Sequence, residues 1–286
     1  MKEKNISILG CGWLGLPLAK KLVENGFLIK GSTTSEEKLT VLEENKIQPY
    51  LIVLNEDKII GKITNFLNES EILIIDIPPK SRANSSTALG KTFVKKIKNL
   101  IVEIEKSAIK KVLFVSSTSV YGDLPIFSTA LEVTEESTLN PDSEGGKQLL
   151  EVEQLLQSNP NFKTTVVRFG GLIGKDRHPI KFLAGRENVE NPEAPINFIH
   201  QVDCIGIIEK LINKGLRQAQ SDNWSWNETF NAVAPNHPIR AEYYHKKALE
   251  MNLKVPTFVK DSISKGKIIS SQKLQQILNY TFQKEI

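Results

Sequence analysis

The stretch ISILGCGWLGLPLAKKL, residues 6–22, decides the fold. It opens with an apolar run typical of a buried strand and, after three glycines, continues with apolar residues at helical spacing. Gly10, Gly12 and Gly15 form the pattern G-x-G-x-x-G between the two elements. In such a turn the first glycine permits the bend, the second lets a pyrophosphate approach, and the third lets the helix pack closely. Because the helix start presents free N–H groups to phosphates, the stretch predicts a dinucleotide-binding turn.

Trp13 and Leu14 lie inside this turn, so we expect them beside the cofactor together with the three glycines. The end of the second strand indicates which cofactor is preferred, because an acidic residue there bonds the ribose diol of NAD. This sequence has Thr33, Thr34 and Ser35 instead, hydroxyls that suit a 2′-phosphate. We therefore expect NADP to be preferred and NAD to be the less favoured cofactor. The alternative is that Ser35 only caps the next helix.

Apolar runs rich in Ile and Val alternate with amphipathic stretches over residues 1–170. The runs are NISILG, FLIKGS, PYLIVL, EILIID, KVLFVSS and TTVVRFG, and helical patterns cover 13–25, 36–45, 57–68, 88–107 and the stretch after Lys147. Strands buried on both faces and separated by helices predict a parallel sheet with right-handed crossovers. The fold class is therefore α/β, a Rossmann-type doubly wound parallel sheet that forms a dinucleotide-binding domain.

Residues 171–286 follow a looser pattern, which six prolines between 179 and 256 break into short elements. We expect a smaller C-terminal, substrate-side lobe there. Some of its elements should return to the Rossmann sheet, among them a late strand at ETFNAV, residues 228–233.

The chain of 286 residues has 37 basic and 33 acidic residues, hence a formal charge of +4. The basic residues are scattered, a pattern that argues against a nucleic-acid partner. Cys11 and Cys204 lie outside any metal-ligand spacing, so neither a disulfide nor a metal site is expected. No run of 18 apolar residues occurs, and the run before Cys11 is too short for a signal peptide. We expect a cytoplasmic protein, not in a membrane, that is a monomer or a homodimer.

Three further motifs follow the glycine turn in order: VSSTSVYGD at 115–123, VVRFGGLIG at 166–174 and INFIHQVDCIGII at 196–208. Together they resemble the extended short-chain dehydrogenase/reductase superfamily of nucleotide-sugar epimerases and dehydratases. RHPIKFLAGR (177–186) and NPEAP (191–195) are similar to an atypical, epimerase-like bacterial branch. The resemblance spans nearly the whole chain.

The resemblance implies an active site around Ser117, the residue four positions before the tyrosine of the VYG motif, with Ser116 beside it at the cofactor. The superfamily's acid/base is a tyrosine in Tyr-x-x-x-Lys at the start of the next helix. Lys147 matches that lysine, as a candidate that holds the nicotinamide ribose, but Ser143 stands where the tyrosine is expected. A serine hydroxyl is much less acidic and shorter than a tyrosine, so Ser143 cannot simply replace it. Tyr121 is the candidate for a displaced acid/base, and a structural loop tyrosine is the alternative.

Several other polar residues have local interpretations. The two literal Tyr-x-x-x-Lys matches, Tyr243 to Lys247 and Tyr280 to Lys284, lie in the C-terminal lobe and are predicted to be surface residues of amphipathic helices. His200 is predicted to be a cap or a core hydrogen-bond partner, and Arg168 to tie loops together. The loop residues Arg177, His178 and Lys181 are candidates to meet an anionic substrate, with an exposed basic loop as the alternative.

These observations predict an NADP-binding oxidoreductase or epimerase-like protein that acts on a small carbonyl or carbinol compound, which the resemblance extends to a nucleotide sugar. Hydride would pass between the nicotinamide and a substrate carbon near Ser117, with the proton handled by Tyr121, a water or the substrate. A non-catalytic NADP-binding redox sensor or regulatory protein is the first alternative. The second is a hydroxyacid-type dehydrogenase, which predicts a long helical C-terminal domain.

Overall fold

The computed structural model describes residues 4–79, 92–127, 131–216, 226–260 and 263–286. Its centre is a seven-stranded sheet in the order β13-β10-β7-β6-β1-β2-β3. The strands are β1 (Asn5–Leu9), β2 (Leu28–Thr33), β3 (Gln48–Leu51), β6 (Ser70–Ile75), β7 (Lys111–Ser117), β10 (Lys163–Phe169) and β13 (Thr229–Ala232). All neighbours pair in parallel, so their carboxyl ends share one edge, where ligands bind in open α/β sheets. The predicted Rossmann-type fold is confirmed.

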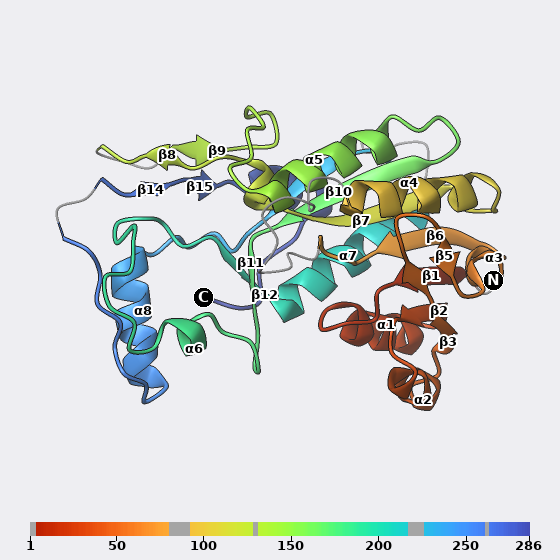
Figure 1. Ribbon diagram of the computed structural model, residues 1–286, viewed down its shortest axis with the longest axis horizontal. Helices are drawn as coiled ribbons and strands as arrows, with labels where there is room; N and C mark the ends of the chain where they lie inside the picture. Colours follow the sequence, from red (N-terminus) through yellow and green to blue (C-terminus); the bar gives the residue numbers. More distant parts are fainter. Residues whose placement is uncertain (1–3, 80–91, 128–130, 217–225, 261–262) are drawn as a thin grey trace.

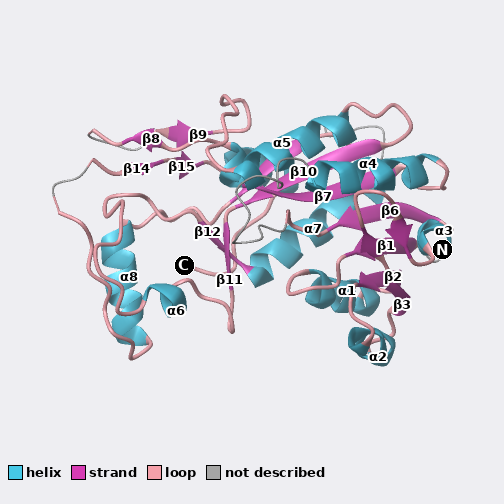
Figure 2. Ribbon diagram, viewed as in Figure 1, coloured by secondary structure: helices cyan, strands magenta, loops and turns pink. Residues whose placement is uncertain are grey.

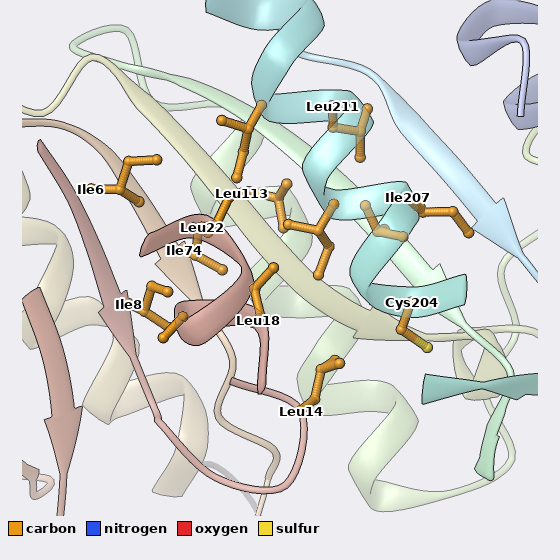
Figure 3. Packing of buried hydrophobic residues seen from close by; sticks show 14 of the residues in the cluster. Ile6, Ile8, Leu14, Leu18, Leu22, Ile74, Leu113, Cys204, Ile207 and Leu211 are labelled. Atoms are coloured by element: carbon orange, nitrogen blue, oxygen red, sulfur yellow. The ribbon is translucent and has the colours of Figure 1, made fainter. Parts of the chain in front are cut away.

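Helices cover both faces of this sheet (Figure 1). On one face lie α1 (Gly15–Glu24), α2 (Glu37–Glu44), α7 (Gln201–Leu216) and α9 (Gln272–Leu278); on the other lie α3 (Ile63–Leu67), α4 (Thr92–Glu105) and α5 (Glu144–Gln157). Strand β6 shows why its sequence is continuously apolar. Ile72 and Ile74 belong to the first hydrophobic cluster, part of which is drawn in Figure 3, whereas Leu73 and Ile75 belong to the second.

The C-terminal lobe lies beyond one end of the sheet and contains little regular structure (Figure 2). Its elements are β11 (Gly171–Ile173), α6 (Ile180–Leu183), β12 (Phe198–His200) and α8 (Arg240–Glu250). Two short ribbons complete it: β8 (Leu124–Pro125) pairs with β14 (Lys265–Gly266), and β9 (Glu132–Val133) pairs with β15 (Ile268–Ile269). A 3-10 turn, η1 (Thr118–Val120), joins β7 to this lobe. Residues from both halves of the chain therefore build the lobe around the end of β7.

Elements of the C-terminal half also contribute to the sheet and its cover. The stretch ETFNAV contains β13, which extends the sheet next to β10. Helices α7 and α9 contribute Ile207, Leu211 and Leu274 to the same cluster as α1.

The segment between β3 and β6 differs from the expectation of one strand and one helix over 57–68. A short hairpin of β4 (Val53–Leu54) and β5 (Ile59–Ile60) precedes α3, which has only five residues. Gly61 is the reason, because its φ is +107° and an added Cβ would lie 2.0 Å from the carbonyl oxygen of Leu51. This left-handed, crowded turn prevents the helix from starting earlier.

Among the described residues, no helix has the length and apolar character needed to cross a membrane. The same part of the chain contains no group of three or more His, Cys, Asp or Glu residues arranged to hold a metal ion.

Candidate functional site

The glycine turn has the geometry that its motif requires. Gly10 has a φ of +105°, and an added Cβ would lie 2.3 Å from the carbonyl oxygen of Asp76. At Gly15 an added Cβ would lie 2.2 Å from the carbonyl oxygen of Gly10, so α1 packs directly on the turn. Around Gly12, in contrast, no heavy atom of the described residues, apart from Gly12 and its chain neighbours, lies within 4 Å of the Cβ position. The space at Gly12 fits a pyrophosphate, which needs close access to the backbone.

Two hydrogen bonds to Ser32 of strand β2 hold the glycine turn in place. The Gly10 N–H donates to the Ser32 hydroxyl at 3.0 Å, and the Cys11 N–H donates to the Ser32 carbonyl at 2.8 Å. Burial raises the pKa of the Cys11 thiol to about 12, so this thiol stays protonated and packs as an apolar group. Ser32 thus holds the turn and is not available to a ligand.

The hydroxyls predicted to select NADP have different environments. Thr33 is buried, and its hydroxyl accepts the Ser35 N–H at 3.1 Å. Thr34 is exposed, as is Lys38 in the first turn of α2. Ser35 does not cap α2, whose N-cap is Glu36 without a side-chain hydrogen bond. Thr34, Ser35 and Lys38 are therefore the groups placed at the surface beside the end of β2.

Trp13 connects the glycine turn to the C-terminal half of the chain. Its indole N–H donates to Asp176 Oδ1 at 2.9 Å, and its backbone carbonyl accepts from Gln201 Nε2 at 2.6 Å. The Arg177 guanidinium lies over the indole ring, 5.0 Å from its centroid. Arg177, a candidate for the substrate, thus lies against the cofactor turn instead. Leu14 is buried in the cluster below the turn, together with Cys204 (Figure 3).

Asp76 is a residue of this site that the sequence reasoning missed. It follows β6 directly and lies against both Gly10 and Gly15. Burial raises the pKa of its carboxyl to about 7, and the Gly15 N–H opposes that rise. The available signal was its position, because an acidic residue at the carboxyl end of a buried parallel strand faces the ligand edge.

The two serines at the end of β7 have separate roles. The Ser117 hydroxyl accepts the Ser119 N–H at 3.1 Å and so caps η1, with its side chain only partly buried. Ser116 is buried, and its hydroxyl donates to Glu153 Oε1 at 2.5 Å. Ser117 lines the cavity described below, and Ser116 is turned toward α5.

Tyr121 belongs to a buried polar network. Its side chain is 2% exposed, and its hydroxyl donates to Asn231 Oδ1 at 2.9 Å and accepts from Arg168 Nη1 at 2.6 Å. Arg168 is bonded in turn to both carboxylate oxygens of Glu153 on α5. Burial raises the pKa of Tyr121, which disfavours the ionised form that a general base needs. The structure does not bring the Tyr121 hydroxyl to the cavity, and Arg168 joins helix α5 to the residue that follows η1.

The start of α5 is occupied by structural contacts. The Ser143 hydroxyl accepts the Gly146 N–H at 3.1 Å and caps the helix. Lys147 Nζ lies 2.7 Å from Glu144 Oε1, in an ion pair whose side chains are 55% and 61% exposed. An added Cβ on Gly146 would lie 2.3 Å from the Ser119 carbonyl oxygen, so the helix start packs against η1. Lys147 therefore lies on a helix that begins next to η1, but its ammonium is in a solvent-exposed ion pair.

A cavity of about 320 Å³ opens beside Ser117. One side is formed by Ser117, Thr118 and Ser119, and another by Lys265 and Lys267 of the lobe. Because β11 and the turn before it also contribute, the cavity lies between the sheet edge and the lobe.

The charge in this cavity is mainly positive. Among the described lining residues, Arg240, Lys265 and Lys267 contribute three cations, against the single carboxylate of Asp123. Lys267 Nζ lies 2.7 Å from Asp123 Oδ1, so that pair is largely neutralised. Arg240 Nε is buried and has no hydrogen-bond partner among the described residues.

The other polar candidates lie outside this cavity. Tyr243 and Tyr280 are 4% and 5% exposed, so the prediction that they are surface residues is wrong. Both pack inward and pair their hydroxyls, Tyr243 with His178 Nε2 at 2.9 Å and Tyr280 with Asp203 Oδ1 at 2.9 Å. His200 Nδ1 accepts the Val202 N–H, the predicted cap at the start of α7.

No family model matches the chain. It is 30% identical to protein YeeZ of Escherichia coli over 282 residues, which cover 98% of this chain and 96% of that protein. A structure of UDP-glucose 4-epimerase from Thermotoga maritima with UDP-glucose matches with a TM-score of 0.78 and 17% identity, over 98% of this chain and 94% of that one. UDP-glucuronic acid 4-epimerase from Bacillus cereus in complex with NAD matches with a TM-score of 0.77 and 13% identity, over 98% and 92%. The chain therefore belongs to the family of protein YeeZ, and it shares its fold with these two epimerases.

Proposed function

We propose that this protein binds a nicotinamide dinucleotide at the glycine turn, NADP in preference to NAD. The observation that carries the proposal is the contrast between Gly12, which faces open space, and Gly10 and Gly15, which are enclosed. The NADP preference is supported by the exposed Thr34 and Lys38 at the end of β2. Positions 33–35 there carry hydroxyl side chains and not the carboxylate that would bind the ribose diol of NAD. The epimerase from Bacillus cereus provides the precedent of NAD bound in this fold.

The substrate is a small carbonyl or carbinol compound with an anionic group, bound in the cavity beside Ser117. Its anionic group meets Arg240 and Lys265, because both cations line the cavity and Lys265 is exposed. The epimerase from Thermotoga maritima, solved with UDP-glucose, makes a nucleotide sugar the first class to test.

A bound nicotinamide would supply hydride chemistry, in which a hydride passes between its C4 atom and a substrate carbon. The Ser117 hydroxyl, on the cavity wall, donates a hydrogen bond to the substrate oxygen and so orients it. Ser116 acts through Glu153 and fixes the end of β7 relative to α5. Lys147 must leave Glu144 to reach a nicotinamide ribose. Because the Tyr121 hydroxyl is buried and already makes two hydrogen bonds, a water or the substrate itself carries the proton in this proposal.

A non-catalytic NADP-binding protein is the second candidate. It is supported by Ser143, which caps α5 in place of an acid/base tyrosine, and by the cavity lining, which contains no Tyr, His or Cys among the described residues. The hydroxyacid-type alternative lacks support, since helices α6 and α8 in the described part of the lobe have four and 11 residues.

The test combines binding with turnover. Purified protein is titrated with NADPH and NADH, and hydride exchange from labelled NADPH is measured with UDP-sugars and small anionic carbonyl compounds. Binding with exchange supports the enzyme. Binding without exchange in the wild type, the Ser117→Ala variant and the Tyr121→Phe variant supports the non-catalytic protein. Absence of binding contradicts both.

A further inference from the structure

Asp76 is a carboxylic acid placed against the turn that is proposed to hold two phosphates. An added Cβ on Gly15 would lie 3.0 Å from Asp76 Oδ2, so the carboxyl touches the first residue of α1. Its backbone is fixed as well, because its N–H donates to the Leu9 carbonyl at 2.9 Å. The carboxyl therefore lies between the ends of β1 and β6, at the helix start that attracts phosphate.

No cation compensates this carboxyl in the described part of the chain. None of the ion pairs there includes Asp76. The titratable groups that face it are the thiols of Cys11, on the turn, and Cys204, on α7. Burial raises the pKa of both thiols well above neutrality, so both are uncharged. Within the described residues, the Gly15 N–H and the partial positive charge of α1 are what remain to stabilise an Asp76 anion.

A dinucleotide pyrophosphate competes for those same groups. Its two negative charges repel an ionised Asp76 and take up the field of the helix start. A protonated carboxyl avoids this repulsion and gains an O–H donor, while its second oxygen still accepts the Gly15 N–H. We propose that Asp76 is a cofactor-contacting residue that is protonated when a dinucleotide is bound, so that binding above neutral pH takes up a proton, and that its O–H then donates to a phosphate or ribose oxygen. This inference rests on the proposed dinucleotide site.

The sign of the pH effect follows from linkage. The free protein holds the Asp76 proton below pH about 7, where binding needs no proton from solvent. Above that pH a proton must be taken up, so affinity falls as the pH rises. A further rise of about one unit in the Asp76 pKa on binding corresponds to about a tenfold loss of affinity across that range.

The experiment measures the dissociation constants of NADH and NADPH from pH 6 to pH 9. It compares the wild type with Asp76→Asn and with Asp57→Asn, an exposed carboxylate whose loss changes the net charge equally. The ratio of wild-type to variant constants cancels the ionisation of the ligand itself. We expect affinity to fall about tenfold in the wild type and in Asp57→Asn, and about twofold or less in Asp76→Asn.

Proton uptake gives a second readout that needs no variant. Calorimetry of the wild type at pH 8, in two buffers with different ionisation enthalpies, should show a fraction of a proton, up to one, taken up per dinucleotide bound. Binding without proton uptake, or equal pH profiles of the wild type and Asp76→Asn, would overturn the inference while leaving the proposed site intact. Absence of binding at every pH would overturn the proposed function, and the inference with it.

Discussion

The glycine turn and the start of α5 match the motifs of the resembled superfamily to different degrees. At the turn, Gly10 and Gly15 are enclosed and Gly12 is open, as a pyrophosphate requires. At the start of α5 the helix and its lysine are present, but Ser143 caps the helix and Lys147 pairs with Glu144. At the start of α5, therefore, the helix and the lysine match the motif, whereas the tyrosine that would act with the lysine is replaced by a serine.

The same contrast extends to what lies beneath each region. Below the turn are Ser32 and the apolar cluster of α1 and α7. Below η1 and α5 is a polar network in which Glu153 joins Ser116 to Arg168. The turn leaves open space beside Gly12, whereas the second region joins its buried side chains to one another by hydrogen bonds.

The largest effect is expected at the turn itself. Gly12→Val should abolish NADPH and NADH binding while the protein stays folded, because the new side chain fills open space. Gly15→Ala is the matched control and should lower the melting temperature, since its Cβ meets the Gly10 carbonyl oxygen. Calorimetric titration and thermal unfolding measure the two effects. Retained affinity in a folded Gly12→Val protein would show that the turn is only structural.

Beneath α5, Glu153→Gln should lower the free energy of unfolding by about 3–5 kcal/mol, because it leaves the Arg168 charge buried without its partner. Urea unfolding measures the change, with Glu144→Gln in the exposed pair as the control. A loss below about 1 kcal/mol would mean that solvent reaches Arg168 after the substitution and that the network is not dry.

Asp76 links the turn to the pH dependence of stability. Its carboxyl ionises near the ordinary pKa in the unfolded chain and at about 7 in the folded one, so the folded state binds more protons between these values. This group should therefore lower stability by about 1.4 kcal/mol per pH unit up to about pH 7 and level off above it. Asp76→Asn removes this slope, and its gain over the wild type should be about 3 kcal/mol larger at pH 8 than at pH 5. An unchanged gain at the two pH values would contradict the raised pKa.

Ser143→Ala sharpens the comparison at the start of α5. The loss of the cap to the Gly146 N–H should cost about 1 kcal/mol of stability and leave NADPH affinity unchanged. Ser143→Asp, which preserves a capping oxygen, is the control for stability. A fall in cofactor affinity without a fall in stability would assign Ser143 to the ligand site.

The smallest effect is expected for Lys147→Ala. Because its ammonium is exposed and paired with Glu144, the substitution should change stability and NADPH affinity by less than about 1 kcal/mol. Lys98, in an exposed pair with Glu151 on the same side of the sheet, provides a matched Lys98→Ala control. An affinity loss of about 1–3 kcal/mol would instead show that Lys147 reaches the nicotinamide ribose.

The sequence indicated most of the fold, because strands such as β6 are apolar on both faces and the glycine turn has a fixed geometry. It did not indicate whether a given polar side chain points into the core or toward the cavity. Tyr121 points inward because of Arg168 and Asn231, which lie 47 and 110 residues away in the chain. The contact of Arg177 with Trp13 also joins residues far apart in the chain, so no local pattern predicts it. Asp76, in contrast, had a positional signal, since it directly follows a buried parallel strand.

The most direct test of dinucleotide binding at the glycine turn is an equilibrium titration of the wild-type protein with NADPH and with NADH. Nicotinamide fluorescence reports the binding. We predict saturable binding of one NADPH per chain, about tenfold or more tighter than NADH, since one or two charge-assisted hydrogen bonds to the 2′-phosphate suffice for that ratio. Equal affinities would remove the role assigned to the end of β2. Failure of both nucleotides to bind would contradict the claim that this chain has kept a working dinucleotide site.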